Sequence, residues 1–258
     1  MCVSGQLAPT FPLFLTKCRS VVSFALVPKT FKIYRIAGSD ITDARDCSVY
    51  LLDVGELVMI DVGFGASLDG VASNIKEQGF SPEDVSTVIL THCHVDHIGG
   101  AGEWRRRFGS RLAMHELDAE IVARGDQRLT AAFCFQRVLQ PFTVDTLLSG
   151  HEGKLVIGGY ELVWLHTPGH TPGSISVYID VGDKRILFAQ DLGAPLLKEF
   201  DCDPVAWRAS AERLLALNAD ILADGHSGVY QPADRVRRYI ESCMRANLSE
   251  ERGRSSDI

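Results

Sequence analysis

The sequence has no long apolar run and no excess of basic residues. No stretch reaches the roughly 18–20 apolar residues that a helix needs to span a bilayer, which argues against a membrane protein. Lys and Arg number 26 against 33 Asp and Glu, a net charge of −7. A general nucleic-acid binder needs a basic surface to displace counterions. We therefore expect a protein that binds neither membranes nor nucleic acid.

The sequence also lacks paired-cysteine motifs, although it contains seven cysteines. An odd number without the spacing of a disulfide framework favours a reducing compartment. The first 28 residues contain two short apolar runs separated by Lys17 and Arg19. A secretory signal would instead show one unbroken apolar run after a basic start. These features predict a cytoplasmic protein.

No internal repeat, low-complexity tract or linker divides the chain. Its 258 residues are 46% hydrophobic and 23% charged, which is typical of a globular protein with one sizeable core. We expect an N-terminal arm over residues 1–30, one domain over 31–248 and a polar tail over 249–258. The arm would cover a sheet edge or reach a neighbouring subunit, so a homodimer is one expectation.

Strand-like runs of apolar and β-branched residues occur in two blocks, and helical patterns follow each block. The predicted strands cover residues 31–37, 47–54, 57–61 and 85–90, then 154–157, 160–165, 175–180, 185–189 and 221–223. The predicted helices cover 67–78, 102–108, 116–139, 205–217 and 232–247, with Asp203 as the N-cap of the fourth. This order predicts two sheets packed face to face with helices outside, in one α/β domain.

A dense group of metal-competent side chains follows the predicted strand over 85–90. His92, His94, Asp96 and His97 occur within six positions, and Gly99 and Gly100 come soon after them. Imidazoles and carboxylates at alternate positions after a strand end can face one cavity. Packing alone gives no reason for four such side chains together, so this run predicts a metal site.

Three later residues occupy the same kind of place. His170, Asp191 and His226 each follow a predicted strand closely, the first in the run Thr167-Pro168-Gly169-His170. Functional side chains gather on loops at strand ends because the strands hold those loops rigidly. We expect these residues to join the first group.

Taken together, the motif His-x-His-x-Asp-His, the later Thr-Pro-Gly-His, the single Asp after a strand and the final Gly-His form a specific combination. It resembles the motifs of the metallo-β-lactamase-fold superfamily, which includes glyoxalase II and quorum-quenching lactonases. The resemblance covers roughly residues 31–245 and follows the order of the family's motifs. It implies a four-layer αβ/βα sandwich with a metal site in a cleft at one edge of the two sheets.

The resemblance also implies a role for each residue. His92, His94 and His170 would bind a first metal ion, Asp96, His97 and His226 would bind a second, and Asp191 would bridge both. Asp61 would support a ligand imidazole from behind, which fixes the ring and raises its basicity. The alternative for Asp61 is a turn-forming residue after a strand.

Nitrogen and oxygen ligands suit zinc, and they also suit iron or manganese. Two divalent ions close together can share a water and lower its pKa, which yields a bridging hydroxide. The sequence therefore predicts a dinuclear metal-dependent hydrolase of a small ester-like bond: a lactone, a thioester or a phosphoester. The resemblance implies that Asp96 is also catalytic, because it would orient the hydroxide or carry a proton to the leaving group.

Two other functions stay open. One is an iron-dependent redox enzyme of the same fold, similar to the sulfur dioxygenases, and the other is a non-catalytic binding module. The Gly-Arg signature that glyoxalase II and sulfur dioxygenases carry soon after the bridging Asp is missing after Asp191. The Tyr that lactonases often place there is missing too, and zinc β-lactamases generally lack the bridging Asp itself. The substrate class stays open.

Other chemically versatile side chains near the motifs are expected to be structural. We predict Cys93 as a buried bystander, His115 and His166 as structural residues and His151 as solvated. We also expect Phe64, Phe133, Phe135 and Phe142 to pack in the core.

Overall fold

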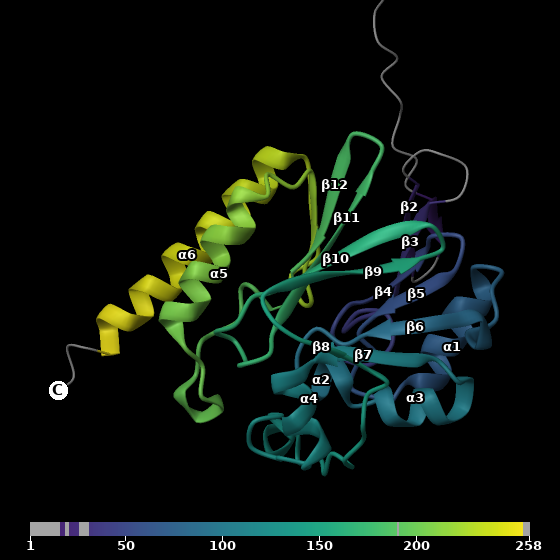
Figure 1. The fold of residues 1–258 in the computed structure, drawn as a ribbon, viewed down its shortest axis with the longest axis horizontal. Helices are drawn as coiled ribbons and strands as arrows, with labels where there is room; N and C mark the ends of the chain where they lie inside the picture. The colour runs from purple at the N-terminus through teal and green to yellow at the C-terminus, as the bar shows by residue number, and fades with distance from the viewer. Residues whose placement is uncertain (1–15, 19–20, 26–30, 190, 255–258) are drawn as a thin grey trace, which may run out of the picture.

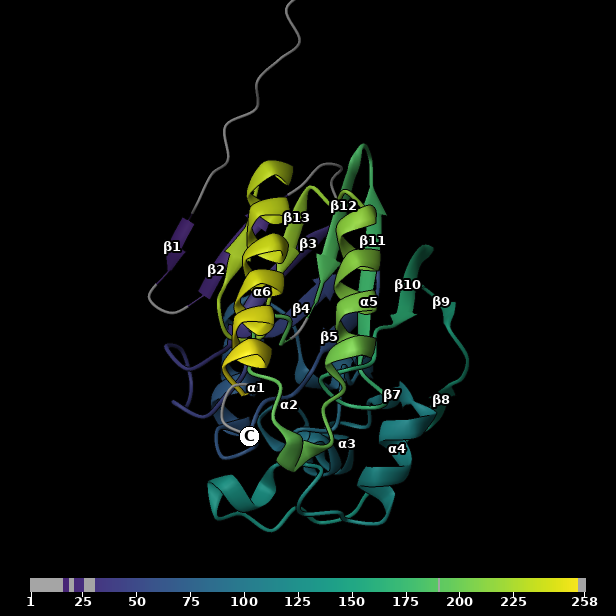
Figure 2. The same cartoon turned by 90° about the vertical axis from the view of Figure 1, so that its left-hand side faces the viewer.

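The computed structural model describes residues 16–18, 21–25, 31–189 and 191–254. Two sheets face each other, and helices cover the outer face of each (Figure 1). From left to right in Figure 1, α5 and α6 form one outer layer, followed by the two sheets and then by α1 and α3. Figure 2 shows α5 and α6 side by side in that outer layer. This four-layer arrangement confirms the predicted α/β fold.

The first sheet has eight strands in the order β1 to β8. They are β1 (Thr16–Cys18), β2 (Val21–Ala25), β3 (Lys32–Ala37), β4 (Val49–Asp53), β5 (Leu57–Ile60), β6 (Val85–Ile89), β7 (Arg111–His115) and β8 (Thr146–Leu148). Strands β5, β6, β7 and β8 pair in parallel. The loops that follow β5 and β6 therefore leave from the same edge of the sheet.

The second sheet has six strands in the order β14-β13-β12-β11-β10-β9. They are β9 (Glu152–Ile157), β10 (Tyr160–His166), β11 (Ile175–Val181), β12 (Lys184–Phe188), β13 (Ile221–Ala223) and β14 (Val229–Tyr230). Strands β12 and β13 are parallel, and β10 runs in the same direction because both β10 and β12 are antiparallel to β11. The loops after β10, β12 and β13 therefore also share one edge.

The helices are α1 (Leu68–Glu77), α2 (Val95–Ile98), α3 (Ala101–Phe108), α4 (Glu116–Ala123), α5 (Pro204–Ala216) and α6 (Ala233–Arg254). Three short 3₁₀ turns are η1 (Pro82–Asp84), η2 (Ala132–Phe135) and η3 (Lys198–Phe200). Asp203 caps α5 as predicted, because its Oδ1 accepts hydrogen bonds from the backbone N–H groups of Val205 and Ala206. None of the helices in the described part of the chain is long and apolar enough to cross a bilayer.

The core consists of three apolar clusters, one in each gap between layers. Tyr50, Ile60 and Phe188 belong to the cluster between the sheets. Trp104 is fully buried with the residues beneath α1 and α3, and Trp207 is buried beneath α5 and α6. Burial of both faces explains why strands such as β4 and β5 appear in the sequence as nearly continuous apolar runs.

The predicted helix over residues 116–139 is wrong beyond Ala123. Gly125 adopts a positive φ of 67°, and the Asp126 carboxylate accepts hydrogen bonds from the backbone N–H groups of Arg128 and Leu129. A left-handed glycine and an Asx turn together end a helix. The segment that follows is irregular apart from η2, and it forms a long loop at one edge of the sandwich (Figure 1).

The C-terminal end of the described chain differs in detail from the expected boundary, and the N-terminal end adds strands to the first sheet. Helix α6 continues to Arg254, although a polar tail is predicted from residue 249. Glu and Arg are good helix formers, so a polar composition does not stop the helix. At the other end, β1 and β2 extend the first sheet beyond β3. The division into arm, domain and tail stays a prediction.

Candidate metal centre

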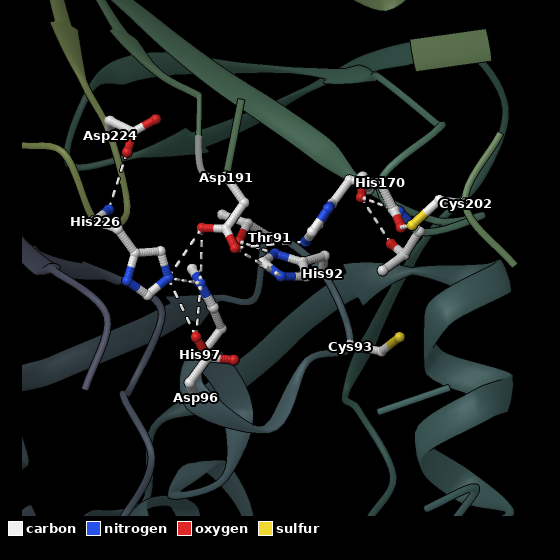
Figure 3. A network of polar contacts seen from close by, with 12 residues as sticks. Thr91, His92, Cys93, Asp96, His97, His170, Asp191, Cys202, Asp224 and His226 are labelled. Atoms are coloured by element: carbon white, nitrogen blue, oxygen red, sulfur yellow. Dashed lines mark hydrogen bonds and ion pairs between the residues drawn. The ribbon is translucent and has the colours of Figure 1, made fainter. Parts of the chain in front are cut away.

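The seven side chains predicted as ligands come together at one edge of the sandwich, and Figure 3 labels all of them except His94. They follow β6, β10, β12 and β13, from both sheets, mostly on loops, and Asp96 and His97 lie in the short helix α2. Ligand atoms of His92, His94, His170 and Asp191 all lie within 4.8 Å of one another, and the same holds for Asp96, His97, Asp191 and His226. Only Asp191 belongs to both of these groups.

The two carboxylate oxygens of Asp191 face different groups (Figure 3). Its Oδ2 lies 3.4 Å from His170 Nε2 and 3.9 Å from His92 Nε2. Its Oδ1 lies 3.0 Å from His97 Nε2 and 3.3 Å from His226 Nε2. The backbone of Asp191 is left-handed, with a φ of 57°. A carboxylate in this position can connect two ions.

The first group contains buried nitrogens that lack hydrogen bonds. Nε2 of His92, Nε2 of His94 and both ring nitrogens of His170 make none within the described structure. A buried polar atom without a partner costs about 1–3 kcal/mol. Burial lowers the pKa of His94 to about 3 and that of His92 well below its usual value, so both rings are neutral. Neutral imidazole is the form that binds a metal, and these atoms therefore fit a divalent ion.

The second group mixes imidazole and carboxylate more closely. His226 Nε2 lies 3.1 Å from Asp96 Oδ2 and 3.3 Å from His97 Nε2. Burial opposes protonation of His226, but hydrogen bonds to Asp191 and Asp96 outweigh it and raise the pKa of His226 to about 10. A metal ion bound here would take the place of that proton.

Asp61 contacts His97 of the second group through Nδ1, the ring nitrogen that does not face the other candidate ligands. Its Oδ2 lies 2.8 Å from His97 Nδ1, and it accepts a hydrogen bond from the Thr91 hydroxyl at 2.8 Å. Its Oδ1 accepts another from the Thr91 backbone N–H at 2.8 Å. With Nδ1 held by Asp61, the Nε2 atom of His97 faces Asp191 and His226. The contact expected from the sequence is present, and the backbone of Asp61 also has a positive φ of 61°.

Cys47 lies near the same imidazole but is a poor ligand. Its sulfur groups with His97 and Asp61 within 4.8 Å. Burial raises the pKa of the Cys47 thiol to about 12, so it stays protonated. Because the thiolate is the form that binds metals, the structure gives Cys47 a packing role.

Asp118 in α4 is a residue that sequence reasoning missed. Its Oδ2 accepts hydrogen bonds from the Cys93 backbone N–H at 2.8 Å and from the Thr171 hydroxyl at 2.6 Å. Its Oδ1 accepts one from the Gly173 backbone N–H at 2.6 Å. Cys93 lies between His92 and His94, and Thr171 follows His170. One buried carboxylate thus connects two loops that carry candidate ligands.

The remaining polar candidates lie outside the two groups. The Cys93 sulfur points away from the ligands in Figure 3 and donates to the Leu129 carbonyl at 3.5 Å. His115 is the N-cap of α4, and its ring stacks on that of His166 with centroids 4.1 Å apart. His166 Nε2 lies 2.8 Å from the Pro172 carbonyl oxygen, and His151 is exposed. These placements agree with the structural roles expected from the sequence.

Comparison with known proteins identifies the family. A family model described as "Metallo-beta-lactamase superfamily" matches residues 42–226, which is most of the chain. The chain therefore belongs to the metallo-β-lactamase superfamily.

Two curated relatives and one solved structure illustrate the similarity. A probable metallo-hydrolase, YqgX from Bacillus subtilis, is 34% identical over 110 residues, which are 42% of this chain and 49% of the relative. A hydroxyacylglutathione hydrolase from Acidiphilium cryptum is 31% identical over 160 residues, 60% of this chain and 55% of the relative. The chain thus spans about half the length of these relatives. A metallo-β-lactamase from Cronobacter sakazakii, solved as a HARLDQ motif mutant, superposes with a TM-score of 0.75 at 24% identity. This match covers 92% of the chain and 99% of that protein, and it shows a shared fold.

Proposed function

We propose that the protein is a dinuclear metal-dependent hydrolase that cleaves a small ester-like bond in a small-molecule substrate. The bond would be a lactone, a thioester or a phosphoester. The observation that carries this proposal is Asp191, whose two oxygens face two separate groups of imidazoles, all of them buried except that of His226. Membership of the superfamily and the names of the relatives, a metallo-hydrolase and a hydroxyacylglutathione hydrolase, support it.

In this proposal His92, His94 and His170 hold one ion, Asp96, His97 and His226 hold the other, and Asp191 is shared. The ions, zinc or alternatively iron or manganese, would polarise the scissile group and lower the pKa of a water between them. Asp61 keeps His97 oriented through Nδ1. Asp96, whose side chain is 12% exposed and next to His226, would accept a proton from that water and return it to the leaving group.

The iron-dependent redox alternative would use the same ligands as the hydrolase. The metal that is bound and the reaction that it supports therefore distinguish the two functions. The test is a parallel assay of lactone, thioester and phosphodiester hydrolysis on protein loaded with zinc, manganese or iron, with oxygen uptake followed alongside. We expect two ions per chain and hydrolysis of at least one bond class. Full activity after complete metal removal, or oxygen uptake by the iron form without hydrolysis, would contradict the proposal.

Replacement of the shared carboxylate gives a sharper test. Asp191→Asn keeps the shape of the side chain and tolerates the positive φ, but it removes the charge that both ions would share. We expect hydrolysis to fall by more than about 100-fold, together with loss of bound metal measured by elemental analysis. Asp180→Asn is the control, because Asp180 is an exposed carboxylate paired with Arg185 on β11. Retained metal and activity in Asp191→Asn would count against a shared carboxylate.

We also propose a cytoplasmic location. Among the cysteine side chains that the structure describes, Cys47, Cys93, Cys134 and Cys243 are free thiols. Free thiols are typical of a reducing compartment, which supports this location. A homodimer stays a prediction that light scattering of the purified protein would test.

A further inference from the structure

Two phenylalanines form a series of ring contacts that begins at the metal centre. The ring of Phe200, in η3, lies 5.4 Å from the ring of His94 between centroids, edge to face. The ring of Phe133, in η2, lies 6.0 Å from that of Phe200. Phe133 is 52% exposed, so the expectation that it packs in the core is wrong. The apolar contacts therefore lead from a candidate ligand to the protein surface.

The neighbouring phenylalanines behave differently. Phe64 is buried, its ring lies 5.4 Å from that of Phe135, and both pack with the cluster beneath α1 and α3. Phe133 and Phe200 belong to none of the three apolar clusters. The core thus gives no reason for their position, whereas proximity to His94 does.

The two loops that carry these rings are fastened to each other. The Arg128 guanidinium donates to both carboxylate oxygens of Asp201, at 2.9 and 2.8 Å, and to the Glu199 carbonyl at 2.7 Å. A bidentate pair of this kind fixes orientation as well as distance. In Figure 1 the loop with η3 and the loop after α4 lie at the same edge of the sandwich.

The segment with Phe200 is also fastened to the loop of His170. The Cys202 sulfur donates to the His170 carbonyl at 3.0 Å, as Figure 3 shows. The Asp203 backbone N–H donates to the Gly169 carbonyl at 2.8 Å. The position of Phe200 is therefore set relative to the ligands before any substrate binds, which limits the ordering that binding would require.

We propose that Phe200 and Phe133 bind the acyl part of the substrate and that this part is apolar. The inference rests on the proposed function, and it narrows the substrate to esters or thioesters of a medium-chain or aromatic acid. A scissile carbonyl at the ions would place the adjacent acyl carbons beside Phe200 and the more distant carbons beside Phe133. Burial of an apolar chain against these rings supplies binding energy that a short acyl group cannot obtain.

The test compares acyl chain lengths on one leaving group. Acetyl, butyryl and octanoyl p-nitrophenyl esters and the matching thioesters would be assayed with metal-loaded wild type, Phe200→Ala, Phe200→Leu and Phe133→Ala. We expect the octanoyl-to-acetyl ratio of kcat/KM to fall about tenfold or more in Phe200→Ala, less in Phe133→Ala, and least in Phe200→Leu, which keeps an apolar side chain. Metal content should stay at the wild-type level.

Val138→Ala is the matched control. Val138 lies in the same loop as Phe133 and is 69% exposed, so it tests whether any loss of apolar surface there changes the ratio. We expect Val138→Ala to keep the wild-type ratio. A ratio that is unchanged in both phenylalanine-to-alanine variants, or that falls equally in Val138→Ala, would overturn the inference while leaving the hydrolase proposal intact.

A binding measurement separates failure of this inference from failure of the proposed function. Calorimetry would measure octanoate and acetate binding to metal-loaded wild type and Phe200→Ala. Tighter octanoate binding that is lost in Phe200→Ala would support the apolar site even if no ester were hydrolysed. Equal binding of the two acids by wild type would overturn it.

Discussion

Asp118 holds two ligand-bearing loops through three short hydrogen bonds. Its partners are the backbone of Cys93 on one side and Thr171 with Gly173 on the other. A Cβ on Gly173 would lie 2.5 Å from the Asp118 backbone nitrogen, so only glycine permits this approach. The positions of His92, His94 and His170 relative to each other therefore depend on one carboxylate that would itself touch neither ion.

An amide in place of this carboxylate should loosen the centre. In Asp118→Asn the side-chain NH₂ must face a hydrogen-bond donor whichever way it turns, so at least one bond is lost. We expect the free energy of unfolding to fall by about 1–3 kcal/mol and metal affinity by about 10- to 100-fold. Urea unfolding and chelator competition measure the two effects.

Glu116→Gln, on the exposed side of the same helix, is the control for Asp118→Asn and should change neither quantity. If Asp118→Asn bound metal as tightly as wild type, the two loops would keep their positions without the Asp118 carboxylate.

Among the elements, α6 lies in an outer layer and is hydrogen-bonded to the turn that carries His226. The Tyr239 hydroxyl donates to Asp224 Oδ2 at 2.8 Å and accepts from the Ser227 hydroxyl at 2.7 Å. Asp224 Oδ1 in turn accepts from the backbone N–H groups of His226 and Ser227, both at 2.9 Å. Figure 3 includes the bond from His226 to Asp224. The turn that carries His226 is thus held by a helix that contributes no ligand.

Removal of this hydroxyl should affect the two ions unequally. In Tyr239→Phe the hydrogen bonds to Asp224 and Ser227 are lost, which should cost about 1 kcal/mol of stability. We expect the ion held by His226 to bind more weakly and the ion held by His92, His94 and His170 to be unaffected. A metal titration with two resolved steps would show this. Tyr160→Phe, at the start of β10, is the control, and equal weakening of both steps would contradict the argument.

On the scale of the whole molecule, the centre lies at the edge of the sandwich where segments from both sheets meet. The segment after β6 in the first sheet supplies His92 and His94 from a loop and Asp96 and His97 from α2, and loops of the second sheet supply the other candidate ligands. Ions bound here would connect both halves, and a ligand that binds only the folded state stabilises it. The metal-free protein instead keeps neutral and protonated imidazoles close together.

That mixture predicts a maximum of stability near neutral pH in metal-free protein. The pKa of His94 is lowered to about 3 from 6.5, so its contribution is complete above pH 6.5 and is lost as the pH falls towards 3. The pKa of His226 is raised to about 10, so its contribution is complete below pH 6.5 and is lost as the pH rises towards 10. We expect Tm to decrease on both sides of about pH 6.5, by about 2–4 °C for each 1 kcal/mol lost.

Thermal unfolding in a chelator at a series of pH values measures this profile. In His226→Gln the decrease of Tm at alkaline pH should be smaller, and the decrease of Tm at acid pH should stay the same. Bound metal should reduce both decreases because it excludes protons from the ligands. If Tm fell as much at alkaline pH in His226→Gln as in wild type, the decrease would be due to other groups.

The sequence predicted those parts of the molecule that are encoded locally. The last residues of β6 and β12 are apolar and buried on both faces, and candidate ligands follow each strand within three residues. The end of α4 was not predicted correctly because Gly125 and Asp126 interrupt an otherwise helical pattern. The role of Asp118 was not predicted because its hydrogen-bond partners lie 25 to 55 positions away in the sequence. The exposure of Phe133 depends on the course of a loop that periodicity does not describe.

Asp61 and Asp191 share a left-handed backbone that a residue with a Cβ adopts at a cost of about 1–2 kcal/mol. Glycine would relieve that cost at either position. At Asp61 the relief is outweighed, because glycine would remove the acceptor of the Thr91 N–H, the Thr91 hydroxyl and His97 Nδ1. Directed evolution that screens only for heat tolerance, with a chelator present, should therefore favour glycine at codon 191 and keep aspartate at codon 61. Libraries selected for turnover should retain aspartate at both codons, so the residue recovered at codon 191 would reveal which pressure had acted.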